Sequence, residues 1–214
     1  MTNRGRLTLE RIETEALALI ESEGLDAFSF RGLSKRLGCE PMSLYHHYAS
    51  KAALMDALVD RVVGELPAPP APAPWRSRLS GMAHDFRAMA LRHPAFFRFL
   101  ALHRMNTPGG LAWLDGALQA FRDTGLDDET ASRLFRAFGA FIIGAALDET
   151  SGYAEGPSAV NPPDGPTLAS RYPAVFAAAP HFGRDSAGAI FDLGLDAMLD
   201  ALDARLAARA TSRA

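Results

Sequence analysis

The sequence predicts an all-α protein with an N-terminal helix-turn-helix three-helix module and a C-terminal helical bundle. Apolar residues recur at three- and four-residue spacing along most of the chain, and no segment of the sequence shows sustained strand alternation. A run of alternating proline and alanine at 67–74 cannot be helix or central strand. We therefore expect domains at 1–66 and 75–214, joined by this stiff linker.

Composition places the chain among ordinary globular proteins. Its 214 residues are 48% hydrophobic and 22% charged, enough to bury a sizeable core. The single cysteine, Cys39, excludes an intramolecular disulfide and fits a reducing compartment. No segment resembles a secretion signal, and no apolar run reaches roughly 18 residues. We expect a cytoplasmic protein with no membrane partner.

Capping residues predict four helices in the first domain. Thr8 and Gly24 bound the first helix, and Ser29 caps a second that ends at Gly38. Pro41 suits the first turn of a third helix running to about His47, because its missing N–H needs no partner there. Ser50 caps a fourth helix, which links the module to the second domain. Its inner face consists of Leu54, Leu58 and Val62.

The second domain also follows a helical pattern. Helices are expected at about 75–93, 95–104, 108–124, 128–151 and 185–209. The segment 152–166 is rich in Gly, Pro, Ser and Asn and predicts a loop, and residues 166–180 are expected to hold a short helix.

The second and third helices form the candidate functional motif. A short helix, a tight glycine turn and a second short helix allow the second helix to enter the major groove of DNA. The side chains that should face outward from this helix mostly carry hydrogen-bonding groups; they are Met42, Ser43, Tyr45, His46 and His47. The net charge of −3 argues against nucleic acid, but between Arg31 and Lys51 four basic residues stand against one acid. A local patch suffices to contact a short stretch of backbone.

Residues 28–58 resemble the DNA-binding domain of the tetracycline-repressor (TetR) family. The matching features are Leu37-Gly38, Leu44-Tyr45, Tyr48 and Lys51, and with the first helix the resemblance covers about residues 8–66. The C-terminal part resembles the family's ligand domain more loosely. Its features are Trp75, Arg92-His93-Pro94, the Thr-Gly-Leu break at 124–126, Gly144, Asp148-Glu149 and the segment 191–202.

The resemblance implies specific contacts with double-stranded operator DNA. Tyr45, His47 and Lys51 should hold phosphates, while Met42, Ser43 and His46 face base edges. Ser29 and Arg31 open the bracing helix, where the family makes backbone or base contacts. Phe30 departs from the small polar residue common there, so no polar contact is expected from it.

An effector cavity is also implied by the resemblance. The region around His93 and His103 is rich in aromatic residues, which fits either ordinary core packing or a ligand pocket. The candidate lining residues are Phe86, Met89, His93, Phe97, Leu100, His103, Trp113, Phe138 and Ile142.

Two apolar stripes need burial partners. One consists of Leu134, Phe138, Ile142 and Ala145, and the other of Phe191, Leu195, Met198, Leu202 and Leu206. They fit either an internal core or, as the family implies, a homodimer interface formed by the helices at about 128–151 and 185–209.

These features together predict a ligand-responsive transcriptional regulator. We expect a repressor that leaves a palindromic operator when a small, largely apolar effector binds. The alternatives are a ligand-blind architectural DNA-binding protein and a small helical enzyme that uses the C-terminal cavity. The sequence holds no nucleophile elbow, phosphate-cradling loop or zinc spacing, and the adjacent His46 and His47 diverge on a helix. We therefore expect no catalysis, metal or cofactor.

Overall fold

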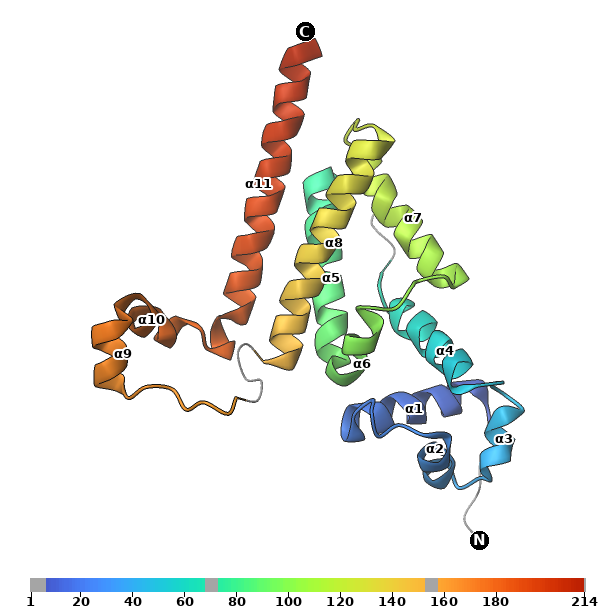
Figure 1. The fold of residues 1–214 in the computed structure, drawn as a ribbon. Helices are drawn as coiled ribbons and strands as arrows, with labels where there is room; N and C mark the ends of the chain where they lie inside the picture. Colours follow the sequence, from blue (N-terminus) through green and yellow to red (C-terminus); the bar gives the residue numbers. More distant parts are fainter. Residues whose placement is uncertain (1–6, 68–72, 153–157, 214) are drawn as a thin grey trace. The chain divides into compact units, whose positions relative to one another are not determined.

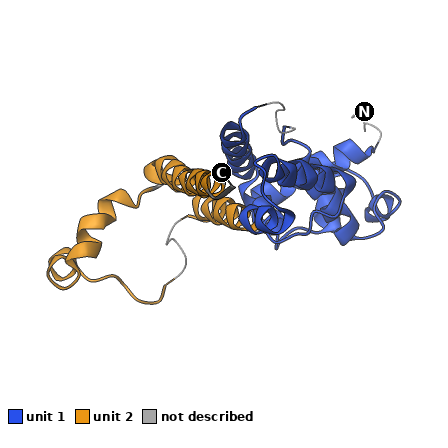
Figure 2. Ribbon diagram, turned by 90° about the horizontal axis from the view of Figure 1, so that it is seen from above, with its two compact units in different colours: residues 1–135 blue, residues 136–214 orange. Residues whose placement is uncertain are grey.

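A computed structural model describes residues 7–67, 73–152 and 158–213, and every regular element among them is a helix. This confirms the all-α prediction. The chain forms two compact units, residues 1–135 and 136–214 (Figure 2). The expected linker at 67–74 lies inside the first unit, and its residues 68–72 fall outside the described residues. The division into domains 1–66 and 75–214 therefore stays a prediction.

The first four helices are α1 (Leu9–Glu23), α2 (Phe30–Leu37), α3 (Pro41–Tyr45) and α4 (Lys51–Val63) (Figure 1). The predicted caps are confirmed, because the hydroxyls of Thr8, Ser29 and Ser50 each accept a hydrogen bond from a first-turn N–H. The third helix ends at Tyr45 rather than about His47. The N–H of His47 donates to the Leu44 carbonyl three residues back. This is a 3₁₀-type hydrogen bond, and it ends the α-helix.

Each of these four helices contributes side chains to the core of the module. Its fully buried side chains come from α1, α2, α3 and α4, and they are Ile12, Ile20, Leu33, Leu44, Leu54, Leu58 and Val62. The predicted inner face of α4 is therefore confirmed. Because Leu44 is the one fully buried residue of α3, it fixes the rotation of that helix about its axis.

The rest of the first unit contains α5 (Trp75–Arg92), α6 (Pro94–Leu100), α7 (Pro108–Arg122) and the beginning of α8 (Asp128–Ser151). Helix α6 ends at Leu100, earlier than the predicted 104. The N–H groups of Leu102 and His103 donate to carbonyls three residues back, so the chain turns there instead of continuing the α-helix.

The second unit contains the remainder of α8, then α9 (Gly165–Arg171), α10 (Pro173–Ala178), two short 3₁₀ turns and α11 (Ala187–Arg213). The single helix expected at 166–180 is thus two helices. Within this unit α11 approaches α8 closely, because a Cβ added at Gly194 would lie 2.5 Å from the Phe141 ring. The rings of Phe141 and Phe191 stack with centroids 5.8 Å apart.

Among the described residues, one helix, α8, is long and apolar enough to cross a membrane by length and composition alone. Only 22% of its most apolar stretch is buried within the protomer. Helices that pack against other helices in soluble proteins meet the same criterion, so this is weak evidence for a membrane span. The exposed apolar surface of α8 does require a partner or an environment that covers it.

We expect Asp123 to contribute to the pH dependence of stability. Hydrogen bonds from Arg78, at 2.5 Å, and from Gln119, at 2.7 Å, hold the pKa of Asp123 below its ordinary value. A depressed native pKa stabilises the fold above the unfolded pKa of about 3.9, and this contribution is lost as the pH falls through the native pKa.

Asp123→Asn should therefore flatten the loss of stability as the pH falls below about 4. The effect will be modest, because the Asp123 side chain is 43% exposed and solvent screens the contact. Urea unfolding across this pH range measures it, with the exposed Asp26→Asn as control. A pH profile of Asp123→Asn that coincides with the parent's would contradict the assignment.

Candidate functional site

The turn between α2 and α3 depends on Gly38. Its φ of 68° is left-handed, a conformation that residues with a Cβ seldom adopt. The N–H of Gly38 donates to the Lys35 carbonyl, and the N–H of Cys39 donates to the Ser34 carbonyl at 3.0 Å. These bonds satisfy carbonyls at the end of α2 and turn the chain toward Pro41. The predicted role of the glycine is confirmed.

Helix α3 and the turn after it present a mixed surface to solvent. Met42 is 67% exposed and Tyr45 47% exposed, and His46 and His47 are exposed as well, while Ser43 is partly covered. All five residues predicted to face outward therefore lie together on one short segment. Contacts with DNA by any one of them remain predictions.

Phe30 positions the ring of Tyr45. The two rings lie with centroids 4.9 Å apart and a 54° angle between their planes, and Phe30 is buried. The first residue of α2 thereby supports a candidate phosphate contact on α3 through packing. The sequence signal for this role is an aromatic residue directly after the Ser29 cap.

Three further candidate DNA contacts flank the turn. Ser29 and Arg31 are exposed at the start of α2, where the Ser29 hydroxyl is engaged as the cap. Lys51 opens α4; its Nζ donates to the Phe28 carbonyl at 3.0 Å and lies 5.2 Å from the centroid of the Phe28 ring. An ammonium group has three donors, so this bond leaves two for a phosphate.

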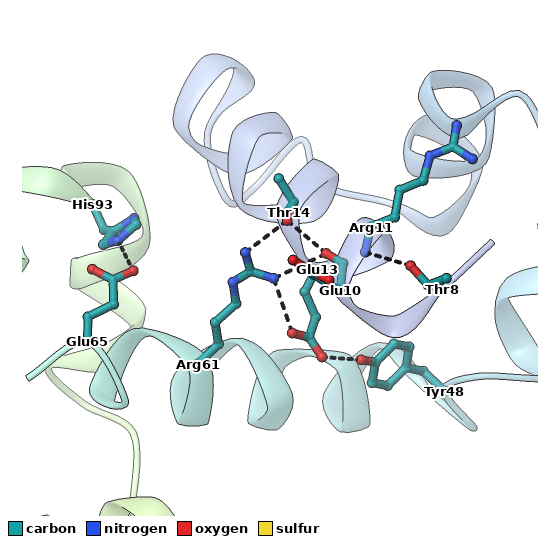
Figure 3. Close-up of polar contacts among 9 residues, drawn as sticks. All are labelled: Thr8, Glu10, Arg11, Glu13, Thr14, Tyr48, Arg61, Glu65 and His93. Atoms are coloured by element: carbon teal, nitrogen blue, oxygen red, sulfur yellow. Dashed lines mark hydrogen bonds and ion pairs between the residues drawn. The ribbon is translucent and has the colours of Figure 1, made fainter. Parts of the chain in front are cut away.

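A polar network braces α1 against α4 behind the turn (Figure 3). The Tyr48 hydroxyl donates to Glu13 at 2.6 Å, and Arg61 donates to Glu13 at 3.4 Å and to the Thr14 hydroxyl at 2.8 Å. Burial, together with the hydrogen bond to Glu13, raises the pKa of Tyr48. Tyr48 therefore keeps its proton and stays a donor at neutral pH.

Four acids of the module face donors on α5, α6 and α7. Glu21 accepts from the backbone N–H groups of Ala95 and Phe96, and Glu65 contacts His93 at 2.9 Å and Arg92. Burial alone would raise the pKa of Glu65, but the hydrogen bonds from His93 and Arg92 hold it below its usual value.

The other two acids of this junction lie on α4. Asp56 is 2.8 Å from Nε2 of His103, and Asp60 accepts a 2.6 Å bond from the Thr107 hydroxyl. Their partners come 47 residues later in the chain. One feature of the sequence could have indicated this junction. Glu21 lies near the carboxyl end of α1, where a negative charge is unfavourable next to the helix dipole and therefore calls for a hydrogen-bond donor from elsewhere.

The predicted effector residues are distributed over both units. In the first unit Phe86, Met89, Phe97 and Leu100 are buried, and the Phe86 ring lies 5.7 Å from that of Phe97 and 5.9 Å from that of Trp113. His93 contacts Glu65 and His103 contacts Asp56, so the two histidines engage different acids of the module. Phe138 and Ile142 belong to the second unit.

A hollow of 430 Å³ lies beside α4 and the loop after α6. Of the predicted effector residues, His103 lines it, and the other lining residues are Asp56, Leu102, Arg104, Asn106 and Thr107. All of its lining residues except Leu102 carry polar side-chain groups, unlike the aromatic cluster around Phe86. In the part of the chain that the structure describes, no three His, Cys, Asp or Glu residues lie close enough to hold a metal ion.

The arrangement defines a class of protein: a helix-turn-helix module with exposed polar and apolar side chains, joined to a helical domain. Comparison with known proteins agrees. Residues 12–58 match the model for bacterial regulatory proteins of the tetR family, and residues 66–206 match the tetracyclin repressor-like C-terminal domain. The chain belongs to the tetracycline-repressor family of bacterial regulatory proteins.

Individual relatives support this membership. The chain is 30% identical over 197 residues to the Escherichia coli tetracycline repressor protein class A from transposon 1721. The alignment covers 89% of this chain and 88% of that protein. It is 30% identical over 145 residues to the transcriptional repressor DrrR1 of Streptomyces coeruleorubidus, of which it spans 54%.

One solved structure also shows a bound small molecule. The Streptomyces coelicolor TetR family protein ActR in complex with actinorhodin superposes with a TM-score of 0.74 and 27% identity, over 94% of this chain and 99% of that one. The matches together assign the chain to the ligand-responsive, DNA-binding transcriptional repressors.

Proposed function

We propose that two copies of this chain bind a palindromic operator in the bacterial cytoplasm and release it when a small, largely apolar effector binds. The observation that carries the proposal is the exposure of Met42, Tyr45, His46 and His47 on a helix held by a left-handed glycine turn. A recognition helix held in this way can enter the major groove without rearrangement.

The dimer would form through α8 and α11. On α11, Leu193 is 74% exposed and Ile190 is also exposed, while Phe191 and Leu195 face inward. Most of the apolar stretch of α8 is likewise uncovered in one protomer. A second copy that covers both helices would bury these residues, and its two-fold axis would place the recognition helices about 34–36 Å apart.

The contacts with DNA would be of two kinds. Tyr45, His47 and Lys51 would bind phosphates, with Ser29 and Arg31 adding contacts at the start of α2. Met42, Ser43 and His46 would face base edges, Met42 through apolar contact such as a thymine methyl group.

The effector would be a small, largely apolar compound. The aromatic cluster of Phe86, Phe97 and Trp113 suits such a ligand. Because Phe86 and Phe97 are buried, the ligand would have to displace their packing partners to reach the rings. The complex of ActR with actinorhodin supports a small-molecule effector. To shift the protein from a mostly operator-binding to a mostly non-binding conformation, the effector must bind the second conformation about 10⁴-fold more tightly than the first. This ratio corresponds to roughly 5.5 kcal/mol.

Operator selection followed by ligand titration tests the proposal. The purified chain should enrich one palindromic sequence from random duplexes, and actinorhodin or another candidate compound should release it at concentrations where the compound binds the free protein. Enrichment without any palindrome would favour an architectural DNA-binding protein. Compounds that bind but release no DNA would contradict the sensing role.

The two kinds of DNA contact predict different mutant behaviour. Tyr45→Ala removes a phosphate contact and should weaken binding to all sequences alike. His46→Ala should change the preferred base at one position of each half-site, by about 1–3 kcal/mol. Competition binding against single-base operator variants distinguishes the two effects. Parental affinity and preference in both mutants would contradict the assignment of α3 as the recognition helix.

A further inference from the structure

Glu21 joins the DNA-binding module to the first turn of α6. Its Oε2 accepts a hydrogen bond from the N–H of Ala95 at 2.9 Å, and its Oε1 accepts one from the N–H of Phe96 at 3.0 Å. The partners lie 74 and 75 residues apart in sequence, so the contact joins two distant segments of the first unit.

The two amides depend on this carboxylate. First-turn N–H groups have no acceptor within their own helix, and the first intrahelical bond of α6 runs from Phe97 to the His93 carbonyl. The side chain of Phe96 is fully buried. Because one planar carboxylate accepts two successive donors, it fixes both the distance and the orientation of α6 against α1.

Helix α1 is also the helix that braces the recognition segment. Through Glu13 it binds Tyr48, which follows α3, and Arg61 on α4. A displacement of α6 that Glu21 passes to α1 therefore reaches the recognition segment. The remaining polar contacts of the junction, from Asp56, Asp60 and Glu65, all start on or just after α4.

We propose that Glu21 is a positioning residue that couples the first turn of α6 to the orientation of the recognition helix. The inference rests on the proposed function. Coupling between two sites is reciprocal, so operator binding must alter α6 if α6 controls operator binding. Operator DNA that holds the recognition segment would restrain α1 through Glu13, and it should thereby tighten the bonds from Ala95 and Phe96 to Glu21.

Residue-resolved amide hydrogen exchange on the full-length protein measures this coupling. The probe is the duplex obtained by operator selection. In the parent, the operator should slow exchange of the Ala95 and Phe96 amides at least fivefold. Glu21→Gln has one acceptor oxygen and places an NH₂ group toward the second donor, so it should lose this response. Because the coupling is reciprocal, its operator affinity should fall by about the same factor of five.

The controls separate geometry from charge. Glu23→Gln removes the same charge from an exposed position on the same helix and should behave as the parent. Glu21→Asp keeps the charge but shortens the reach, and it should behave as Glu21→Gln. This variant decides the question if the glutamine variant does not fold.

Two results would overturn the inference while leaving the proposed function intact. One is an unchanged exchange rate at Ala95 and Phe96 when the parent binds the operator. The other is a parental response in Glu21→Gln and Glu21→Asp. A chain that enriches no operator sequence would instead overturn the proposed function, and the inference with it.

Discussion

Gly38→Val will lower operator affinity by two orders of magnitude or more and will destabilise the module by about 1–3 kcal/mol. Gly38 has a φ of 68°, and a Cβ there would meet open space. The cost therefore comes from the backbone conformation, which a β-branched residue strongly disfavours. Relief of this strain would straighten the turn and rotate α3 away from the groove.

Gly38→Asn is the matched control, because asparagine tolerates the left-handed region far better than valine does. It should retain most of the operator affinity and stability. Urea unfolding and operator titration of both variants measure the two effects. Equal losses of affinity and stability in both variants would contradict this explanation. They would indicate that the turn excludes any side chain at position 38, whatever its preference for a left-handed φ.

Phe97→Ala should have the largest effect on stability, about 3–5 kcal/mol. Phe97 is fully buried on α6, with its ring edge against Phe86. Removal of the ring leaves a cavity beside Phe86 that the surrounding helices cannot fill without moving. Thermal and urea unfolding of the protein measure this loss.

The exposed Phe176→Ala on α10 is the control and should change stability by less than about 0.5 kcal/mol. If Phe97 also lines the effector cavity, the ligand will lose affinity for Phe97→Ala by more than the change in stability alone explains. A loss of stability below about 1 kcal/mol would mean that Phe97 packs against an already open space rather than in a closed core.

Local rules predicted the helix-turn-helix almost completely. The caps Thr8, Ser29 and Ser50 and the stop at Gly38 depend on neighbours within four residues, so the sequence pattern contains their causes. The end of α3 at Tyr45 was missed, because a three-residue bond to Leu44 competes there with the α-helical pattern.

Long-range polar contacts could not be predicted in the same way. His93 and His103 attracted attention as candidate effector residues, yet their acceptors Glu65 and Asp56 lie 28 and 47 residues earlier. Such pairs depend on how α4 packs against α6 and α7, which no local spacing encodes. For the same reason, residues predicted as one effector set proved to belong to two compact units.

The acids at the junction have a consequence for how the protein meets its target. Glu21, Asp56, Asp60 and Glu65 face the helices α5 to α7, whereas the segment from Arg31 to Lys51 carries four cations and one acid. The DNA-binding module is therefore a charge dipole, even though the whole chain carries −3. In the field of a polyanionic duplex such a dipole experiences a torque that turns its cationic pole forward, so orientation begins before contact and weakens with added salt.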